Sequence, residues 1–89
     1  MMIIHKKILP EYFKAVQDGS KTFEIRTDDD GVEVGDMIVL EEWENGHYTG
    51  NRVEREITYV LRNCPQYGLN DGYCIMAIKP LDVSVGAKA

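Results

Sequence analysis

Long hydrophobic runs are missing from this sequence. Of its 89 residues 44% are hydrophobic, but no apolar stretch approaches the roughly 20 residues that a helix needs to cross a bilayer. The apolar residues 1–4 give way at once to His5, Lys6 and Lys7, so the start of the chain lacks the hydrophobic stretch of a signal peptide. We therefore expect a cytoplasmic protein without membrane contacts. Its length suits one domain with a small core.

Cysteine is scarce, and metal-binding patterns are missing. Cys64 and Cys74 stand ten positions apart, which is the spacing of neither a zinc knuckle nor a redox Cys-x-x-Cys motif. In a reducing compartment we expect both to remain reduced, structural thiols. The acidic run Asp28–Asp30 lacks the spacing of an EF-hand loop, so we expect a solvated turn there. The sequence predicts neither a metal nor a cofactor.

Positive charge is also scarce, because ten basic residues stand against fifteen acidic ones and the formal net charge is −5. This balance excludes a protein that coats nucleic acid through bulk electrostatics. The distribution is uneven, since residues 1–26 carry a net charge of +2 and the remainder a net charge of −7. Any anion-binding surface should therefore lie in the first third of the chain.

Proline and apolar spacing place the first elements. Residues 3–8 have the composition of a short strand. Pro10 suits the first position of a helix. Tyr12, Phe13 and Val16 then form an apolar stripe that we expect to pack on a sheet.

The rest of the chain is rich in strand patterns. We predict a strand buried on both faces, a hairpin connection, a long strand, a loop and a last strand. In order, these segments are 37–40, 45–50, 52–62, 63–71 and 73–79. One side of the long strand is apolar and consists of Val53, Ile57, Tyr59 and Leu61. We therefore predict an α+β domain over residues 1–80, with one N-terminal helix and about five strands in a curled or closed sheet. Residues 81–89 should form a tail or an edge strand.

The most informative segment is Gly19–Arg26, where the predicted helix ends and ionisable side chains alternate with large apolar ones. A period of two is typical of a half-buried strand. We expect Phe23 and Ile25 to anchor this strand and its polar side chains to share the other face. An exposed ion pair is one interpretation of those polar residues, and it would contribute only about 0–1 kcal/mol. The other is a site that grips a polar ligand. The polar trio consists of Lys21, Glu24 and Arg26.

The segment resembles the signature of the ASCH domains, which are small β-barrels of the PUA-like superfamily. The matching pattern is Gly19-x-Lys21-x-x-Glu24-x-Arg26, preceded by Tyr12-Phe13 and followed by Val34-Gly35-Asp36. Further matches to a bacterial and phage subfamily of unassigned function are His5-x-x-Ile8, Leu40-x-Glu42-Trp43, Tyr48-Thr49-Gly50 and residues 57–61.

This resemblance implies a PUA-like barrel of about five strands, with the helix packed at one opening. It also implies a cleft floored by the polar trio, where such families bind RNA or modified nucleotides. The chain departs from the subfamily at Asp28 and Asp30, because the subfamily has an asparagine and an arginine in this turn. One cation is therefore missing from the rim of the cleft.

The residues and the resemblance together favour a module that binds RNA or a nucleotide through a few contacts. The predicted ligand-binding residues are Lys21, Thr22, Glu24, Arg26, His5, Lys7 and Tyr48. Trp43 suits core packing, whereas Tyr48 suits packing and base stacking equally. His5 is a candidate in this set, although a packed or hydrogen-bonded histidine is the favoured interpretation. Asp36 should be a turn residue at the start of the next strand.

Two alternatives remain open. Some compact ASCH proteins resemble amidohydrolases that act on acylated cytidine nucleosides, with a lysine at the Lys21 position and a threonine three residues later. Glu24 replaces that threonine here, so Lys21 would be the catalytic base and Glu24 would shuttle the proton. The other alternative is a protein-interaction domain, because all eight charged residues in the range 28–44 are acidic and suit a basic partner.

Overall fold

Five strands form one mixed sheet in the computed structural model, which describes residues 1–81. In chain order they are β1 (Ile3–Ile8), β2 (Phe23–Thr27), β3 (Met37–Glu44), β4 (His47–Arg62) and β5 (Tyr73–Pro80). Their order in the sheet is β1-β3-β4-β5-β2. Strand β1 runs parallel to β3, and all other neighbours are antiparallel. The predicted tail or edge strand lies, from residue 82 onward, outside the described residues.

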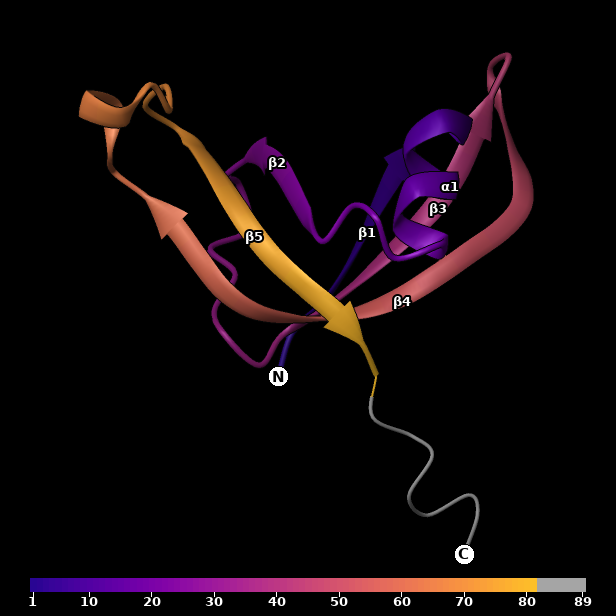
Figure 1. Ribbon diagram of the computed structural model, residues 1–89, viewed down its shortest axis with the longest axis horizontal. Coiled ribbons are helices and arrows are strands. Elements are labelled where there is room, and N and C mark those ends of the chain that lie inside the picture. The colour runs from indigo at the N-terminus through magenta and orange to yellow at the C-terminus, as the bar shows by residue number, and fades with distance from the viewer. Residues whose placement is uncertain (82–89) are drawn as a thin grey trace, which may run out of the picture.

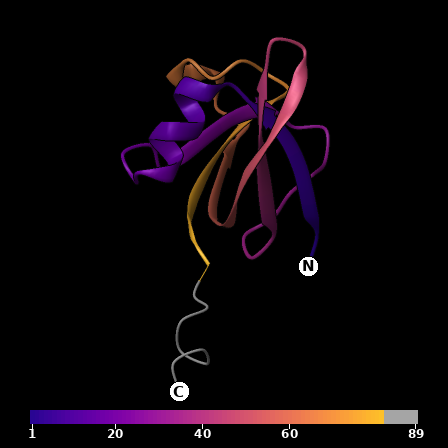
Figure 2. The same cartoon turned by 90° about the vertical axis from the view of Figure 1, so that its right-hand side faces the viewer.

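The sheet curls into a half-barrel whose two edges are β1 and β2 (Figures 1 and 2). One α-helix, α1 (Pro10–Gln17), and one short 3₁₀ turn, η1 (Pro65–Tyr67), complete the described elements. The predicted α+β fold with one N-terminal helix and about five strands is therefore confirmed. Within residues 1–81 the two edge strands do not pair with each other, so the sheet is curled rather than closed.

Helix α1 begins at Pro10 as predicted, and Gly19 follows it with a φ of 89°. Phe13 and Val16 are buried in the core, but Tyr12 is largely exposed. The predicted packing of the apolar stripe on the sheet is therefore confirmed for Phe13 and Val16 and wrong for Tyr12. At eight residues, α1 is too short to cross a membrane, and the described chain contains no helix long and apolar enough to do so.

The core lies on the concave side of the sheet. Its fully buried side chains are Val16, Ile38, Leu40, Ile57, Cys74 and Met76. The prediction of a strand buried on both faces at 37–40 is confirmed for residues 38–40. Cys64 and Cys74 are free and buried, as expected for structural thiols. Burial raises the pKa of the Cys74 thiol, which makes it less reactive.

The hairpin between β3 and β4 is tighter than predicted. Asn45 and Gly46 both have positive φ values, 52° and 84°, as a two-residue type I′ turn requires. Strand β4 consequently starts at His47 instead of residue 52.

A β-bulge changes which residues of β4 face the core, so the predicted apolar side of this strand is partly wrong. Ile57 pairs with Ile78 of β5 and Tyr59 pairs with Ala77, so Thr58 is an extra residue in β4. An extra residue reverses the alternation that follows it. Val60 therefore packs against the core, whereas Tyr59 and Leu61 are exposed.

Two cationic side chains bind the acidic turn after β2. The prediction of a solvated turn is therefore wrong. Arg62 donates to Asp28 from Nε at 2.5 Å and from Nη2 at 3.1 Å, and Nη2 also donates to the Val32 carbonyl at 2.9 Å. Lys6 pairs with Asp30 at 2.8 Å. These bonds hold the loop so that Val32 enters the core.

Asp36 closes the same loop and is the turn residue that the sequence predicts. Its carboxylate accepts hydrogen bonds from the N–H groups of Met2 and Glu33, both at 2.8 Å. These bonds, that of Met2 first, lower the pKa of Asp36 from its ordinary value of 3.8. Asp36 thereby joins the start of β1 to the start of β3.

We expect Asp36→Asn to lower the melting temperature at pH 7, and this loss to shrink on acidification. Because its pKa is lowered in the folded state, the wild-type carboxylate stabilises the fold above its ordinary pKa of 3.8 and loses this effect as the pH falls through the lower folded-state value. Thermal unfolding between pH 7 and about pH 2.5 measures the difference, with the exposed Asp71→Asn as control. A difference that stays constant with pH would contradict the prediction.

Candidate functional site

Strand β2 faces the opposite way from its prediction. Its alternation has the predicted period, but Glu24 is only 3% exposed, whereas Phe23 and Ile25 are 43% and 51% exposed. The pairing with β5 explains the inversion, because Glu24 lies opposite Met76, a fully buried residue of the core. Residues directly opposite on neighbouring strands share one face. The carboxylate therefore points inward, and the apolar residues point out.

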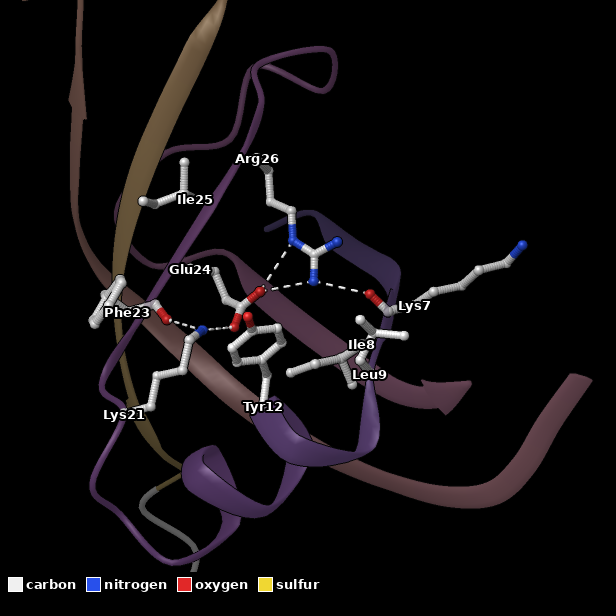
Figure 3. A pocket seen from close by; sticks show the side chains of 9 residues that line it. All are labelled: Lys7, Ile8, Leu9, Tyr12, Lys21, Phe23, Glu24, Ile25 and Arg26. Carbon is white, nitrogen blue, oxygen red and sulfur yellow. Dashed lines mark hydrogen bonds and ion pairs between the residues drawn. The ribbon is translucent and has the colours of Figure 1, made fainter. Parts of the chain in front are cut away.

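Glu24 is held between two cations. Lys21 Nζ contacts Glu24 Oε2 and also donates to the Phe23 carbonyl at 2.7 Å. Arg26 donates to Glu24 Oε1 from Nε at 3.0 Å and from Nη2 at 2.7 Å (Figure 3). A buried carboxylate is costly unless it is paired and hydrogen-bonded, and here both of its oxygens are engaged. The trio keeps a formal net charge of +1.

Arg26 also bridges the open side of the half-barrel. Its Nη2 donates to the Lys7 carbonyl of β1 at 2.9 Å, although β1 and β2 are opposite edges of the sheet. The pair of Lys6 and Asp30 makes a second link across the same opening. We call this opening the seam. Polar side chains thus connect β1 and the β2 segment across the seam, where the described strands form no backbone hydrogen bonds with each other.

The end of α1 sets the position of Lys21. After Gly19 the chain turns back, and the Lys21 N–H donates to the Ala15 carbonyl at 2.9 Å. Ser20 reinforces this turn, because its hydroxyl donates to Asp18 at 2.7 Å. Only a residue that tolerates positive φ fits this turn easily, which is why glycine stands there. Lys21 therefore approaches Glu24 from the side of α1. Arg26 approaches Glu24 from the side of β1.

An open cavity of about 440 Å³ lies against the trio, between α1 and the seam. Its volume is within the range of small-molecule sites. The trio and the backbone carbonyl of Lys7 provide its polar part, as Figure 3 shows. Its apolar walls are Ile8, Leu9, Tyr12, Phe23 and Ile25. All but Ile8 are exposed, so large apolar groups gather around one charged site.

The trio retains unused hydrogen-bond donors. Within residues 1–81, Arg26 Nη1 has no hydrogen-bond partner, since Nε and Nη2 make all of its bonds. An ammonium group has three donors, and Lys21 uses two of them on Phe23 and Glu24. The arrangement can therefore bind a carbonyl or phosphate oxygen without breaking the contacts that hold Glu24.

Four other predicted residues lie apart from the cavity or only border it. His5 is exposed and stands 3.7 Å from Glu41, and Thr22 is exposed and does not line the cavity. Lys7 lines it, but the Lys7 ammonium lies 3.8 Å from the centroid of Trp43. Tyr48 packs edge-on against Trp43, with centroids 4.9 Å apart. Trp43 does not belong to the buried core cluster, so its predicted role in core packing is wrong.

The apolar walls are what sequence reasoning missed. Phe23 and Ile25 were expected to be buried, and Tyr12 was expected to pack on the sheet. One signal was available, because Glu24 and Arg26 share one face of a short strand and Lys21 precedes it, and a charged residue is buried almost only where it is paired. Among residues 1–81, no group of three or more His, Cys, Asp and Glu side chains is arranged to hold a metal ion.

The described residues form a small half-barrel domain with an open cavity beside a charged trio. The chain belongs to the family described as Domain of unknown function (DUF3850), which matches residues 4–78. It is also similar to a protein of Escherichia phage P2, described as "Uncharacterized 12.9 kDa protein in GpA 3'region". The two are 43% identical over 61 residues, which cover 67% of this chain and 56% of the phage protein. The chain thus spans little more than half the length of that relative.

We expect Glu24→Gln to lower the free energy of unfolding by about 2–3 kcal/mol. The substitution keeps the size of the side chain but leaves two partly buried cations without their anion, and breaking a buried pair costs about 3–5 kcal/mol. The lower value reflects the partial exposure of Lys21 and Arg26. Urea denaturation measures the loss. The control is Glu56→Gln in an exposed pair with Lys79, which should change stability by less than about 1 kcal/mol. Equal losses in the two variants would contradict the prediction.

Proposed function

We propose that the cavity binds a nucleotide, either free or within RNA, and that the protein is a nucleotide- or RNA-binding module. One observation carries the proposal: a positively charged trio with unused donors lies at an open cavity that is walled by exposed apolar side chains. Small-ligand sites combine such apolar walls with a few placed polar groups. A nucleotide has the matching chemistry, because a base has flat apolar faces and a polar edge.

The aromatic walls lie close to the charged groups. Lys21 Nζ is 4.9 Å from the centroid of the Phe23 ring and 5.8 Å from that of Tyr12. A base that packs against either ring would bring its edge, or the attached phosphate, near the ammonium. Base–aromatic stacking contributes roughly 1–3 kcal/mol per base. The rings would thus provide affinity, and the cations would provide orientation.

Arg26 is the residue best suited to direct recognition. Its guanidinium is planar, and Glu24 and the Lys7 carbonyl fix its orientation while Nη1 stays available. A fixed guanidinium pays little entropy on binding an acceptor. Glu24 has both oxygens occupied, so its role is to position Arg26 and Lys21. Because the net charge of the chain is −5, binding should depend on these few contacts rather than on bulk attraction.

We further propose that the half-barrel is a member of the PUA-like superfamily, of the ASCH kind. The helix beside the opening of a five-stranded curled sheet, and the position of the trio at that opening, support this relationship. It rests on the sequence pattern from Gly19 to Arg26 and on the topology together. The relationship would make the cavity the ligand cleft of the domain.

The geometry gives less support to the two alternatives. A catalytic lysine needs a free lone pair, whereas Lys21 donates to the Phe23 carbonyl and contacts Glu24. An acidic docking surface needs unpaired carboxylates, but Asp28 and Asp30 are paired with Arg62 and Lys6. Binding is therefore the function that these contacts favour.

We expect the ribonucleoside monophosphates or short RNAs to bind, and Arg26→Gln and Tyr12→Leu each to weaken binding by about tenfold or more. Loss of a hydrogen bond to a charged group costs about 1.5–3 kcal/mol, and loss of a ring removes a stacking partner. Calorimetry for the nucleotides and fluorescence polarisation for labelled RNAs measure the affinities. Arg52→Gln and Tyr59→Leu, outside the cavity, are the matched controls. Absence of any binding that the cavity variants reduce would refute the proposal.

We also expect no deacetylated product from acetylcytidine, because Lys21 is engaged as a donor. Chromatography of a purified sample after prolonged incubation measures product, with Lys21→Met as the control for contaminating activity. Product formed by the wild type and lost in Lys21→Met would favour the hydrolase instead.

A further inference from the structure

A second aromatic surface starts where the cavity ends. Trp43 and Tyr48 pack edge-to-face with an interplanar angle of 82°, and we call them the aromatic pair. Lys7 joins this pair to the cavity. The backbone of Lys7 receives the hydrogen bond from Arg26, whereas its side chain points away from the cavity (Figure 3). The Lys7 ammonium lies 3.8 Å from the centroid of Trp43 and 6.0 Å from that of Tyr48.

Lys7, on the edge strand β1, connects the two surfaces. Lys7 lies opposite Glu41 in the parallel register, and Trp43, two residues further along β3, is on the same face as Glu41 because side chains alternate along a strand. Lys7 and Trp43 therefore share one face of neighbouring strands about 4.8 Å apart, while the Lys7 carbonyl meets Arg26 at the cavity. A chain that leaves the cavity over Lys7 would therefore meet the aromatic pair next.

We infer that the cavity and the aromatic pair bind two successive nucleotides of single-stranded RNA. This inference rests on the proposed function of the cavity. One base occupies the cavity, the next base stacks on the aromatic pair, and Lys7 contacts the phosphate between them. Single-strand binding sites combine stacking rings with cations that follow the backbone, and this surface has both in the required order.

The aromatic pair is available for such a ligand. Tyr48 is exposed, and neither ring belongs to the buried core cluster. Two nearby carboxylates have local partners, since Glu41 stands 3.7 Å from His5. Glu42 accepts hydrogen bonds from Thr49 at 2.7 Å and from Asn51 at 3.0 Å. Lys7 is the cation of this surface that stands over the rings, so the phosphate contact is assigned to it.

Lys7 is placed to exchange partners on binding. In the free protein its ammonium covers the ring of Trp43, where a stacked base would lie. A base that takes this position displaces the ammonium, which then becomes available to the adjoining phosphate. Trp43 is the single tryptophan of the sequence. Its fluorescence therefore reports directly on this exchange.

The test compares the four ribonucleoside monophosphates with the sixteen RNA dinucleotides that carry one internal phosphate, by calorimetry and by Trp43 fluorescence. We expect at least one dinucleotide to bind about tenfold or more tightly than either of its mononucleotides and to change the fluorescence. Tyr48→Leu should remove most of this gain but leave mononucleotide affinity unchanged, and Lys7→Gln should also remove most of the gain. Dinucleotide binding should depend only weakly on salt, with a slope of about −0.7 for one phosphate on a single strand.

Two matched controls are Tyr67→Leu and Lys79→Gln. Tyr67 belongs to η1, the short orange coil far from the β3–β4 hairpin in Figure 1, and Lys79 lies on β5. Neither control should change the gain, and melting temperatures verify that every variant is folded. Mononucleotide binding without a dinucleotide gain would overturn the second site and leave the proposed function intact. A gain that survives both Tyr48→Leu and Lys7→Gln would overturn it as well. Absence of any binding would overturn both.

Discussion

The ionic contacts around Glu24 are the interaction on which the rest of this structure depends. An unpaired charge at this depth would be strongly unfavourable, so the fold must bring two cations to one carboxylate. Lys21 comes from the end of α1, and Arg26 comes from β2 and reaches across the seam to β1. The need to neutralise one buried charge thus aligns the helix with both edges of the sheet. Because Glu24 points inward, its neighbours Phe23 and Ile25 point outward, where they become walls of the cavity.

Charge is partitioned unevenly among the described residues of this acidic protein, so that the trio remains positive. The carboxylates of the loop after β2 are neutralised locally, as Asp28 by Arg62 and Asp30 by Lys6. At the trio, in contrast, two cations share one anion. A local excess of this kind draws a negative or polar group to one cavity without attracting polyanions to the whole surface. Such an arrangement favours recognition of a small group over general affinity for nucleic acid.

Local chemistry accounts for what could be predicted from the sequence. Pro10 begins the helix, the apolar run 38–40 is buried, and the trio does converge on one cavity. Features that depend on distant partners could not be predicted. A period of two has no preferred face, so only the pairing with Met76 decides that Glu24 points inward. The bulge at Thr58 likewise depends on β5, and nothing local indicates it.

The position of β2 in the sheet has a consequence for folding. Phe23 pairs with Ala77, and β5 is the only strand beside β2 in the described sheet. Contacts between segments so distant in sequence form late, so during synthesis the helix and the β3–β4 hairpin can form before β2 has a partner. The cavity is therefore completed only when the last strand arrives. Until then β2 is an unpaired strand with two exposed hydrophobic residues, and its alternating charges protect it against pairing with other chains.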